Sequence, residues 1–343
     1  MRTLLVTVLV SAAAAALAAA AADARPHRLQ APRVADLAYP GTIRTTAATP
    51  KTLRVLAASS FWGGTYTANT GEPVTIYAST AYPEDPAVPQ RWADFLASLL
   101  HGPELAGVRV FLQPEEEISR SCGARALACY DSGSSILIAP GEDVLDGPTA
   151  ESIVAHEYGH HVAAHRANNP WPAVEWGTKR WATYEEVCLR TAKGILSPGN
   201  EGDNYSVNPG EGFAETYRVL NERRLGLAET PWQIVDQFLY PDDAALATVE
   251  QDVTTPWTGT TILRYSGAAK TRTFTIATPL DGTLRAFVRG KYRVDLLSGA
   301  GARVAGGTAT ASATVCGART FKVRVTRNAT AKSGSFALTV SRP

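Results

Sequence analysis

The sequence predicts two domains, an α+β domain followed by an all-β sandwich domain. The length of 343 residues is about twice that of an average domain. Helix-like and strand-like apolar spacings alternate between about residues 51 and 250. From about residue 260 to residue 343 only short alternating strands remain, separated by Gly, Ser and Asn turns. Such a succession of short strands is typical of a sandwich.

Residues 1–24, MRTLLVTVLVSAAAAALAAAAADA, have the features of a secretory signal peptide. Arg2 supplies a positive charge, an alanine-rich apolar stretch follows, and Ala22-Asp23-Ala24 offers an A-x-A cleavage site. A membrane anchor is the alternative, but the stretch is only weakly apolar. We therefore expect a secreted, extracellular protein that has no membrane attachment in its mature form.

Residues 25–50 contain several prolines and show no periodicity. They are expected to be either a flexible lead-in or a short inhibitory pro-segment. The following α+β domain is assigned to residues 51–250 and the β-sandwich to residues 260–343, with a linker-like stretch near residue 250.

The elements of the first domain follow in order. Apolar alternation predicts strands at residues 72–79, 107–114 and 134–140, and helical spacing predicts a helix at residues 89–100. A longer helix is expected from about residue 149, and another over residues 208–224, with Asn208 as N-cap and Pro209 in the first turn.

The helix from about residue 149 carries SIVAHEYGHHVAAHR, residues 152–166, with four of the six histidines. Residues i and i+4 lie on one helix face, so His156 and His160 can present two imidazole nitrogens to one ion. Glu157 is turned by about 100° and can reach a water molecule on that ion without binding the ion itself. The uncharged flanks indicate a buried helix, in which histidine nitrogens need partners.

A catalytic zinc ion needs a third protein ligand and one open position. Glu211 and Glu215 lie one turn apart on the predicted 208–224 helix. One of them would bind the ion while the other accepts the N–H of a ligand histidine. Glu185 and Glu186 are a weaker alternative and are interpreted as a surface pair.

HEYGH followed by EGFAETY resembles the glutamate-type zincin metallopeptidases, in particular the anthrax lethal factor-like proteins. The resemblance covers about residues 134–220 and implies an α+β zincin-like catalytic domain. It implies that Zn²⁺ is bound by His156, His160 and Glu211, and that Glu157 is the general base.

The same resemblance implies that Glu215 supports a ligand histidine from behind. Gly212 departs from the family pattern, which usually has an aromatic residue at that position. These peptidases place a tyrosine just before the third ligand to hold the developing oxyanion, and Tyr205 is near that place. Residues 262–341 are similar to the small C-terminal sandwich domains that secreted bacterial peptidases often carry.

These features predict a secreted zinc metalloendopeptidase that acts on a protein or peptide. Zinc would lower the pKa of its bound water from 15.7 to about 7. Glu157 would take the proton and later return it to the leaving amine, and Tyr205 or His165 would help to stabilise the oxyanion. The strand at residues 134–140 would offer its edge to an extended peptide. Two alternatives stay open: a secreted binding or adhesion protein with an inactive zincin-like domain, and a zinc amidase acting on cell-wall peptide.

Four cysteines in an exported protein indicate two disulfides. Cys122 and Cys129 enclose a short loop and are the natural pair, which leaves Cys188 and Cys316, although three pairings are possible. The formal net charge of +1 gives no indication of a nucleic-acid or membrane-surface partner. We expect a monomer.

Overall fold

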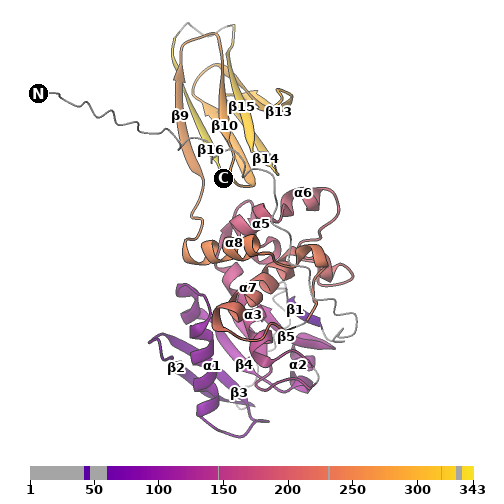
Figure 1. The fold of residues 1–343 in the computed structure, drawn as a ribbon. Helices are drawn as coiled ribbons and strands as arrows, with labels where there is room; N and C mark the ends of the chain where they lie inside the picture. The colour runs from indigo at the N-terminus through magenta and orange to yellow at the C-terminus, as the bar shows by residue number, and fades with distance from the viewer. Residues whose placement is uncertain (1–41, 47–59, 146, 231, 318, 330–333) are drawn as a thin grey trace, which may run out of the picture.

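The computed structural model describes residues 42–46, 60–145, 147–230, 232–317, 319–329 and 334–343 (Figure 1). The predicted signal peptide therefore lies outside the described residues. Of the predicted lead-in at residues 25–50, only the strand Thr42–Thr46 is described. The fold class is the expected one: a mixed α/β domain followed by two four-stranded antiparallel sheets that pack as a sandwich.

A six-stranded mixed sheet underlies the first domain. Its strands are β1 (Thr42–Thr46), β2 (Phe61–Thr67), β3 (Pro73–Ser79), β4 (Arg109–Leu112), β5 (Ala126–Asp131) and β6 (Ile136–Ala139). They lie in the order β1-β5-β6-β4-β3-β2, with β3, β4 and β6 parallel to one another. β2 is antiparallel to β3 and β5 is antiparallel to β6, while β1 pairs in parallel with β5.

The sheet order corrects one expectation. Strand β6 corresponds to the predicted 134–140 strand, which was expected to offer an edge to a peptide. It pairs with β5 on one side and with β4 on the other. Its backbone groups are therefore already used in two ladders, and this prediction is wrong. The outer strands of the described sheet are β1 and β2.

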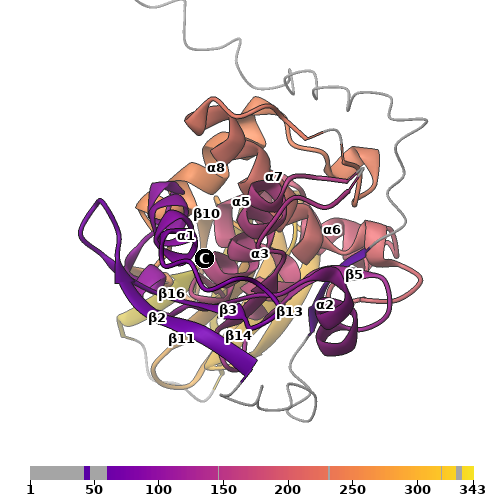
Figure 2. The ribbon, with the colours of Figure 1, turned by 90° about the horizontal axis from the view of Figure 1, so that it is seen from below.

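Helices cover this sheet and build the rest of the domain. They are α1 (Ala87–Ser98), α2 (Glu115–Cys122), α3 (Ala150–Ala164), α4 (Ala173–Trp176), α5 (Lys179–Tyr184), α6 (Val187–Ala192), α7 (Pro209–Leu225) and α8 (Asp243–Thr254). A two-stranded ladder, β7 (Ala167–Asn168) with β8 (Trp171–Pro172), follows α3. Helix α3 packs against β5 and β6 on one side and against α7 on the other (Figures 1 and 2).

Both central helices begin as their sequences predict. The Oγ1 atom of Thr149 accepts a hydrogen bond from the backbone N–H of Ser152 at 3.2 Å and caps α3. The Oδ1 atom of Asn208 accepts from the N–H of Gly210 at 3.0 Å and caps α7, with Pro209 in the first position. These caps fix where each helix starts and hence which residues share a face.

Gly159 sets how closely α3 and α7 approach each other. A Cβ atom added at this position would lie 3.0 Å from Cα of Ala214 and 3.2 Å from the side chain of Tyr217. Almost any side chain there would therefore push the two helices apart. The glycine between His156 and His160 is thus a packing requirement of the interface between α3 and α7.

The second domain is a sandwich of eight strands. These are β9 (Thr261–Gly267), β10 (Thr271–Ala277), β11 (Gly282–Val288), β12 (Tyr292–Ser298), β13 (Arg303–Thr308), β14 (Thr310–Val315), β15 (Thr320–Arg327) and β16 (Phe336–Arg342). One sheet has the order β10-β15-β12-β13 and the other β14-β11-β16-β9. The alternating apolar residues predicted from sequence form its core, among them Ile276, Val294, Val323 and Leu338.

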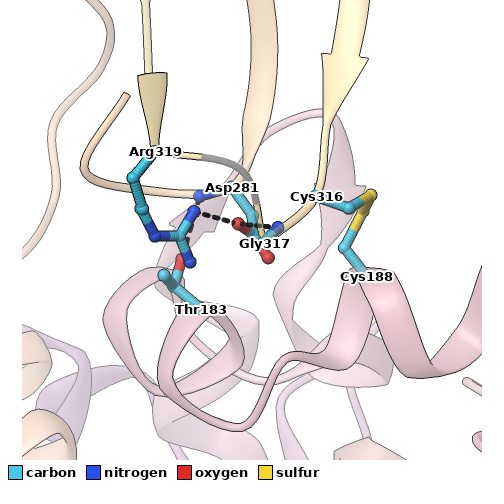
Figure 3. The surroundings of a disulfide bond; sticks show 6 residues. All are labelled: Thr183, Cys188, Asp281, Cys316, Gly317 and Arg319. Atoms are coloured by element: carbon cyan, nitrogen blue, oxygen red, sulfur yellow. Dashed lines mark hydrogen bonds and ion pairs between the residues drawn. A yellow bond between two sulfur atoms is a disulfide. The ribbon is translucent and has the colours of Figure 1, made fainter. Parts of the chain in front are cut away.

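The two domains meet at the α5, α6 and α8 end of the first domain (Figure 1). A disulfide joins Cys188 of α6 to Cys316 in the sandwich, and the N–H of Asp281 donates to Oγ1 of Thr183 at 3.1 Å (Figure 3). Lys179 of α5 is buried at the same interface. A covalent bond and buried polar contacts thus hold the sandwich against the first domain.

The second disulfide joins Cys122 to Cys129, as their spacing predicts. It links the end of α2 to β5. Two disulfides are consistent with an extracellular protein. Within the ranges that the structure describes, no helix is both long enough and apolar enough to cross a membrane.

Candidate metal centre

His156 and His160 of α3 and Glu211 of α7 come together in the interior of the first domain. Each offers one ligand atom, and these atoms all lie within 4.8 Å of one another. All three residues are 0% exposed. The caps set where both helices begin, and Gly159 lets α3 approach α7 closely at Ala214, one turn beyond Glu211. The group could hold a metal ion.

The distances between the three ligand atoms are well below 4.8 Å. Nε2 of His156 lies 3.2 Å from Nε2 of His160 and 3.2 Å from Oε2 of Glu211. Nε2 of His160 lies 3.4 Å from the same carboxylate oxygen. Two imidazole nitrogens therefore face each other and share one oxygen, which is the arrangement of groups that surround a common cation.

The charges in this group favour an anionic Glu211. Burial raises the pKa of a carboxyl group, but the neighbouring imidazoles of His160 and His156 outweigh it and lower the pKa of Glu211. At His160 burial is the largest cause and lowers the pKa, with Glu211 acting in the opposite direction. At His156 burial also lowers the pKa, but Glu211 and Glu215 outweigh it and raise the pKa. A bound metal ion would require both imidazoles in the neutral form and Glu211 as the carboxylate.

Glu157 is the unpartnered acid of the centre. It is 0% exposed, and neither carboxyl oxygen has a hydrogen-bond partner among the described residues. Burial, followed by the charges of Glu211 and Glu201, raises its pKa well above the usual range. Such a group is unfavourable in an interior that serves only for packing. Glu157 is therefore the candidate proton-transfer group of this centre.

Tyr205 reaches the centre from the short 3₁₀ turn Tyr205–Val207, which precedes α7. Its hydroxyl donates a hydrogen bond to Oε2 of Glu211 at 2.7 Å. Burial, and then the charge of Glu211, raises the pKa of Tyr205 well above its usual range, so the hydroxyl keeps its proton. The resemblance to the lethal factor-like proteins implies a role for this tyrosine at the oxyanion. The structure places its hydroxyl on the oxygen that also faces both histidines.

Glu215 lies behind His156. Its Oε2 atom is 3.6 Å from Nδ1 of His156, slightly beyond hydrogen-bond length, while Nε2 of the same ring faces Glu211. Glu215 is held by the fully buried Arg218, whose Nε donates to Oε2 at 3.0 Å. Arg218 also donates to Oε1 of Glu222 at 2.6 Å. This carboxylate–guanidinium–carboxylate chain holds Glu215 in place beside the imidazole.

Sequence reasoning missed Arg218 and Glu222. The signal was present, because these residues follow Glu215 at i+3 and i+7 on a helix whose other face is apolar. Charged residues at this spacing are usually solvated, so their spacing alone did not distinguish a buried network from a surface ladder.

Gly212 is the position at which the chain departs from the lethal factor-like pattern. A Cβ atom added there would lie 3.3 Å from Cη2 of Trp181. Trp181 of α5 is fully buried, and its Nε1 donates to Oγ1 of Thr216 at 3.1 Å. The large aromatic side chain beside this part of α7 is therefore supplied by a different helix.

The structure does not bring the other candidates to the metal group. His165 is exposed beyond the end of α3, and its Nδ1 contacts the carbonyl of His161 at 2.9 Å. Among the described residues, Glu185 and Glu186 are not part of any group able to hold a metal. Their interpretation as a surface pair is wrong, because Glu185 is 0% exposed and Glu186 is only partly exposed. A pocket of about 260 Å³ lies near Tyr82 and Gly141, and none of the metal-group residues lines it.

Comparison with known proteins adds nothing to this picture: no family model matches the chain, and no curated protein matches its sequence. The His156, His160 and Glu211 group on α3 and α7 fits a zincin-like site on its own geometry.

Proposed function

We propose that this protein is a secreted zinc-dependent metallopeptidase that hydrolyses peptide bonds. One observation carries the proposal. The ligand atoms of His156, His160 and Glu211 lie 3.2 to 3.4 Å apart, beside a buried Glu157 carboxyl that has no partner among the described residues.

The distances within the ligand group support zinc. Zinc bonds to histidine nitrogen and carboxylate oxygen are about 2.0–2.1 Å long, so a tetrahedral ion separates its ligand atoms by about 3.3–3.4 Å. The three separations in this centre are 3.2, 3.2 and 3.4 Å. Two nitrogens and one oxygen leave the fourth position open, as a catalytic site requires and a structural site does not.

The residues around the group support hydrolysis. A zinc ion at this place supplies a Lewis acid that acidifies water and polarises a carbonyl. Within the described ranges Glu157 has no competing hydrogen bond, and its pKa is raised, so it can accept a proton, hold it and return it to a leaving amine. Tyr205 donates to Glu211 and orients that carboxylate. Glu215 lies against Nδ1 of His156 and favours the tautomer whose Nε2 is free to bind.

Substrate entry requires movement. The glutamates and histidines of the centre are 0% exposed, so a peptide reaches Glu157 only after the segments that cover it are displaced. The outer edge of β5, the strand beside α3, is occupied by β1. Because β1 belongs to residues 25–50, this pairing supports the inhibitory pro-segment among the two interpretations of that stretch. Displacement of β1 would open a sheet edge to an extended peptide.

The test separates metal binding from turnover. Elemental analysis of the mature protein should find about one zinc ion per chain, and mass spectrometry of a proteome-derived peptide library should show cleavage that a chelator abolishes. Glu157→Gln should keep the zinc and lose turnover by about 10²- to 10⁴-fold, since an amide cannot accept the proton.

Glu185→Gln is the matched control, because Glu185 is also 0% exposed but lies outside the metal group. It should keep both zinc and turnover. Absence of zinc after reconstitution with excess metal would exclude the proposal. Turnover of Glu157→Gln within a few-fold of the parent protein would exclude Glu157 as the base.

A further inference from the structure

The charges of the chain are strongly separated between its two domains. Residues 260–343 contain 14 Lys and Arg, two Asp and no Glu, which is a formal net charge of +12. The preceding 259 residues contain the other 19 Lys and Arg against 30 Asp and Glu, a net charge of −11. The whole-chain value of +1 conceals this separation, and the sequence-based expectation about partners rested on that value.

The two acids of the sandwich do not offset its charge at the surface. Asp281 and Asp295 are each 2% exposed. Oδ1 of Asp281 accepts from Arg319 Nη1 at 2.7 Å beside the domain interface (Figure 3). Asp295 is enclosed by arginines. The sandwich therefore presents cationic side chains to solvent and no acidic side chain.

The arginines around Asp295 gather on one sheet. Asp295 of β12 lies opposite Arg324 of β15 and opposite Gly306 of β13. Its carboxylate accepts from Arg293 Nε at 3.1 Å, from Arg303 Nε at 3.0 Å and from Arg324 Nη2 at 3.2 Å. We call the outer side of this sheet, defined by these three arginines, the arginine face.

Gly306 makes room for the cluster. A Cβ atom added there would overlap Oδ1 of Asp295 and the guanidinium of Arg303. The bare backbone of β13 thus lets Arg303 reach across the strand to Asp295. The convergence of arginines from three strands on one carboxylate is therefore built into the local structure.

The cluster carries more positive charge and more donors than Asp295 can use. One carboxylate faces three guanidinium groups, which leaves two positive charges unbalanced. Arg293 and Arg303 each reach Asp295 through Nε, so their terminal Nη groups are not used on the carboxylate. The three side chains remain 42–50% exposed. One arginine suffices to neutralise the charge of Asp295, so the positive charge of the other two remains available to an external anion.

We propose that the arginine face binds an anionic cell-surface glycopolymer, a chain with repeated phosphate or carboxylate groups. Guanidinium forks suit both anions. Cations on neighbouring strands about 4.8 Å apart can follow a repeating polyanion. The inference does not depend on the peptidase activity, because its residues lie in the sandwich, on the far side of α5 and α8 from the six-stranded sheet (Figure 1).

Other polyanions fit this face less well. The outward positions of β10, β12 and β15 hold Thr, Ala, Arg, Lys, Asp and Leu, and no aromatic ring on which a nucleic-acid base could stack. Val304 is the one large apolar residue of this sheet among those exposed in the described structure. A membrane-inserting surface needs more apolar area than that.

The test measures binding of the full chain to poly(glycerol phosphate) and to polygalacturonate at about 0.15 M salt, by isothermal titration calorimetry. The Arg293→Gln/Arg303→Gln variant keeps Arg324 to neutralise Asp295. The matched control is Arg264→Gln/Arg285→Gln, which removes two exposed charges from the outer side of the opposite sheet. Circular dichroism and thermal melting establish that each variant is folded.

The arginine-face variant should bind at least about 10-fold more weakly and show a shallower dependence of affinity on salt. The control should bind within about 3-fold of the parent protein. Preference for one polymer identifies phosphate or carboxylate as the ligand group, and either result supports the proposal. Equal weakening in both variants would overturn it, because net charge alone would then explain the binding.

Three further results would also overturn the proposal: no binding to either polymer, tighter binding to a 20-base-pair DNA duplex, or tighter binding to phosphatidylglycerol vesicles. Another outcome is that the parent protein self-associates and the Arg293→Gln/Arg303→Gln variant does not. That result would overturn the proposal, because it would assign the arginine face to the acidic first domain of a second copy. Analytical ultracentrifugation measures that case.

Discussion

Alanine replacement of the two glutamates of α7 should separate a metal ligand from the residue that supports a ligand. Glu211 contributes one of the three ligand atoms, so Glu211→Ala leaves only two histidines at the centre. Glu215 lies on the far side of His156 from Glu211, with its Oε2 atom 3.6 Å from Nδ1 of that ring. Loss of such an outer partner typically weakens metal affinity by about 10- to 100-fold, which is about 1.4 to 2.7 kcal/mol. Glu211→Ala should exceed that range and empty the site.

The buried arginine adds a second effect that must be measured separately. Glu215→Ala leaves Arg218 with Glu222 as its remaining carboxylate. Breaking a fully isolated buried ion pair costs about 3–5 kcal/mol of stability. The remaining carboxylate keeps the pair neutral, so the loss of stability should be smaller.

Glu222→Ala is the matched control, because it removes the other carboxylate and leaves Arg218 paired with Glu215. It should lower the stability of the metal-free protein by at least as much, because it also removes the hydrogen bonds from Oγ of Ser152 and the N–H of Thr230. It should leave zinc affinity within a few-fold of the parent value, since Glu222 contacts Ser152, Arg218 and the N–H of Thr230 but, among the described residues, no histidine.

Zinc titration against a competing chelator gives the affinities, and urea denaturation of the metal-free variants gives the stabilities. If Glu215→Ala loses more zinc affinity than Glu211→Ala, the two roles are reversed. If Glu222→Ala weakens zinc binding as much as Glu215→Ala, the effect passes through helix stability and not through His156.

Three further predictions follow from single contacts. Tyr205→Phe should weaken zinc binding, because the hydroxyl of Tyr205 orients Glu211. Zinc titration measures this effect. An unchanged zinc affinity together with a lower kcat would instead assign Tyr205 to the oxyanion. Burial lowers the pKa of Lys179 to about 8, so below that pH the folded protein carries an unfavourable buried charge. Between pH 8 and 10.5 Lys179 loses its proton in the folded protein but keeps it in the unfolded chain, and the folded protein becomes more stable. Between pH 8 and 10.5 the free energy of unfolding of the parent protein should therefore rise by up to about 3 kcal/mol relative to that of Lys179→Met. A difference between the two proteins that does not depend on pH would contradict this. Removal of residues 25–50 should increase cleavage of extended peptides, because β1 then no longer occupies the outer edge of β5; unchanged rates would leave that segment without an inhibitory role.

Several parts of the centre could be predicted because they depend on local geometry. The i, i+4 spacing of His156 and His160 specifies one helix face, and Asn208 with Pro209 specifies where α7 begins. Glu211 then falls in the first turn of α7 whatever lies around it. The inward positions of the sandwich follow in the same way from a period of two.

Other parts could not be predicted because they depend on residues that are distant in sequence. Strand β5 lies between β6 and β1, so the edge expected at β6 does not exist. The burial of Arg218 between two glutamates depends on what covers α7. The aromatic ring beside Gly212 comes from Trp181, about 30 residues earlier in the chain.

The sequence by itself determined the two-domain fold class, the helix that carries the histidines and the residue types available for a metal, because periodicity, capping and composition are local properties of a chain. The sequence also determined the separation of charge between the two domains, although the net charge of the whole chain conceals it. Only the tertiary structure decided which carboxylate faces which imidazole nitrogen, that Cys188 bonds to Cys316, and that arginines of three strands meet at Asp295. Those contacts arise from sheet order and from the approach of α3 to α7, which many distant residues set together through close packing.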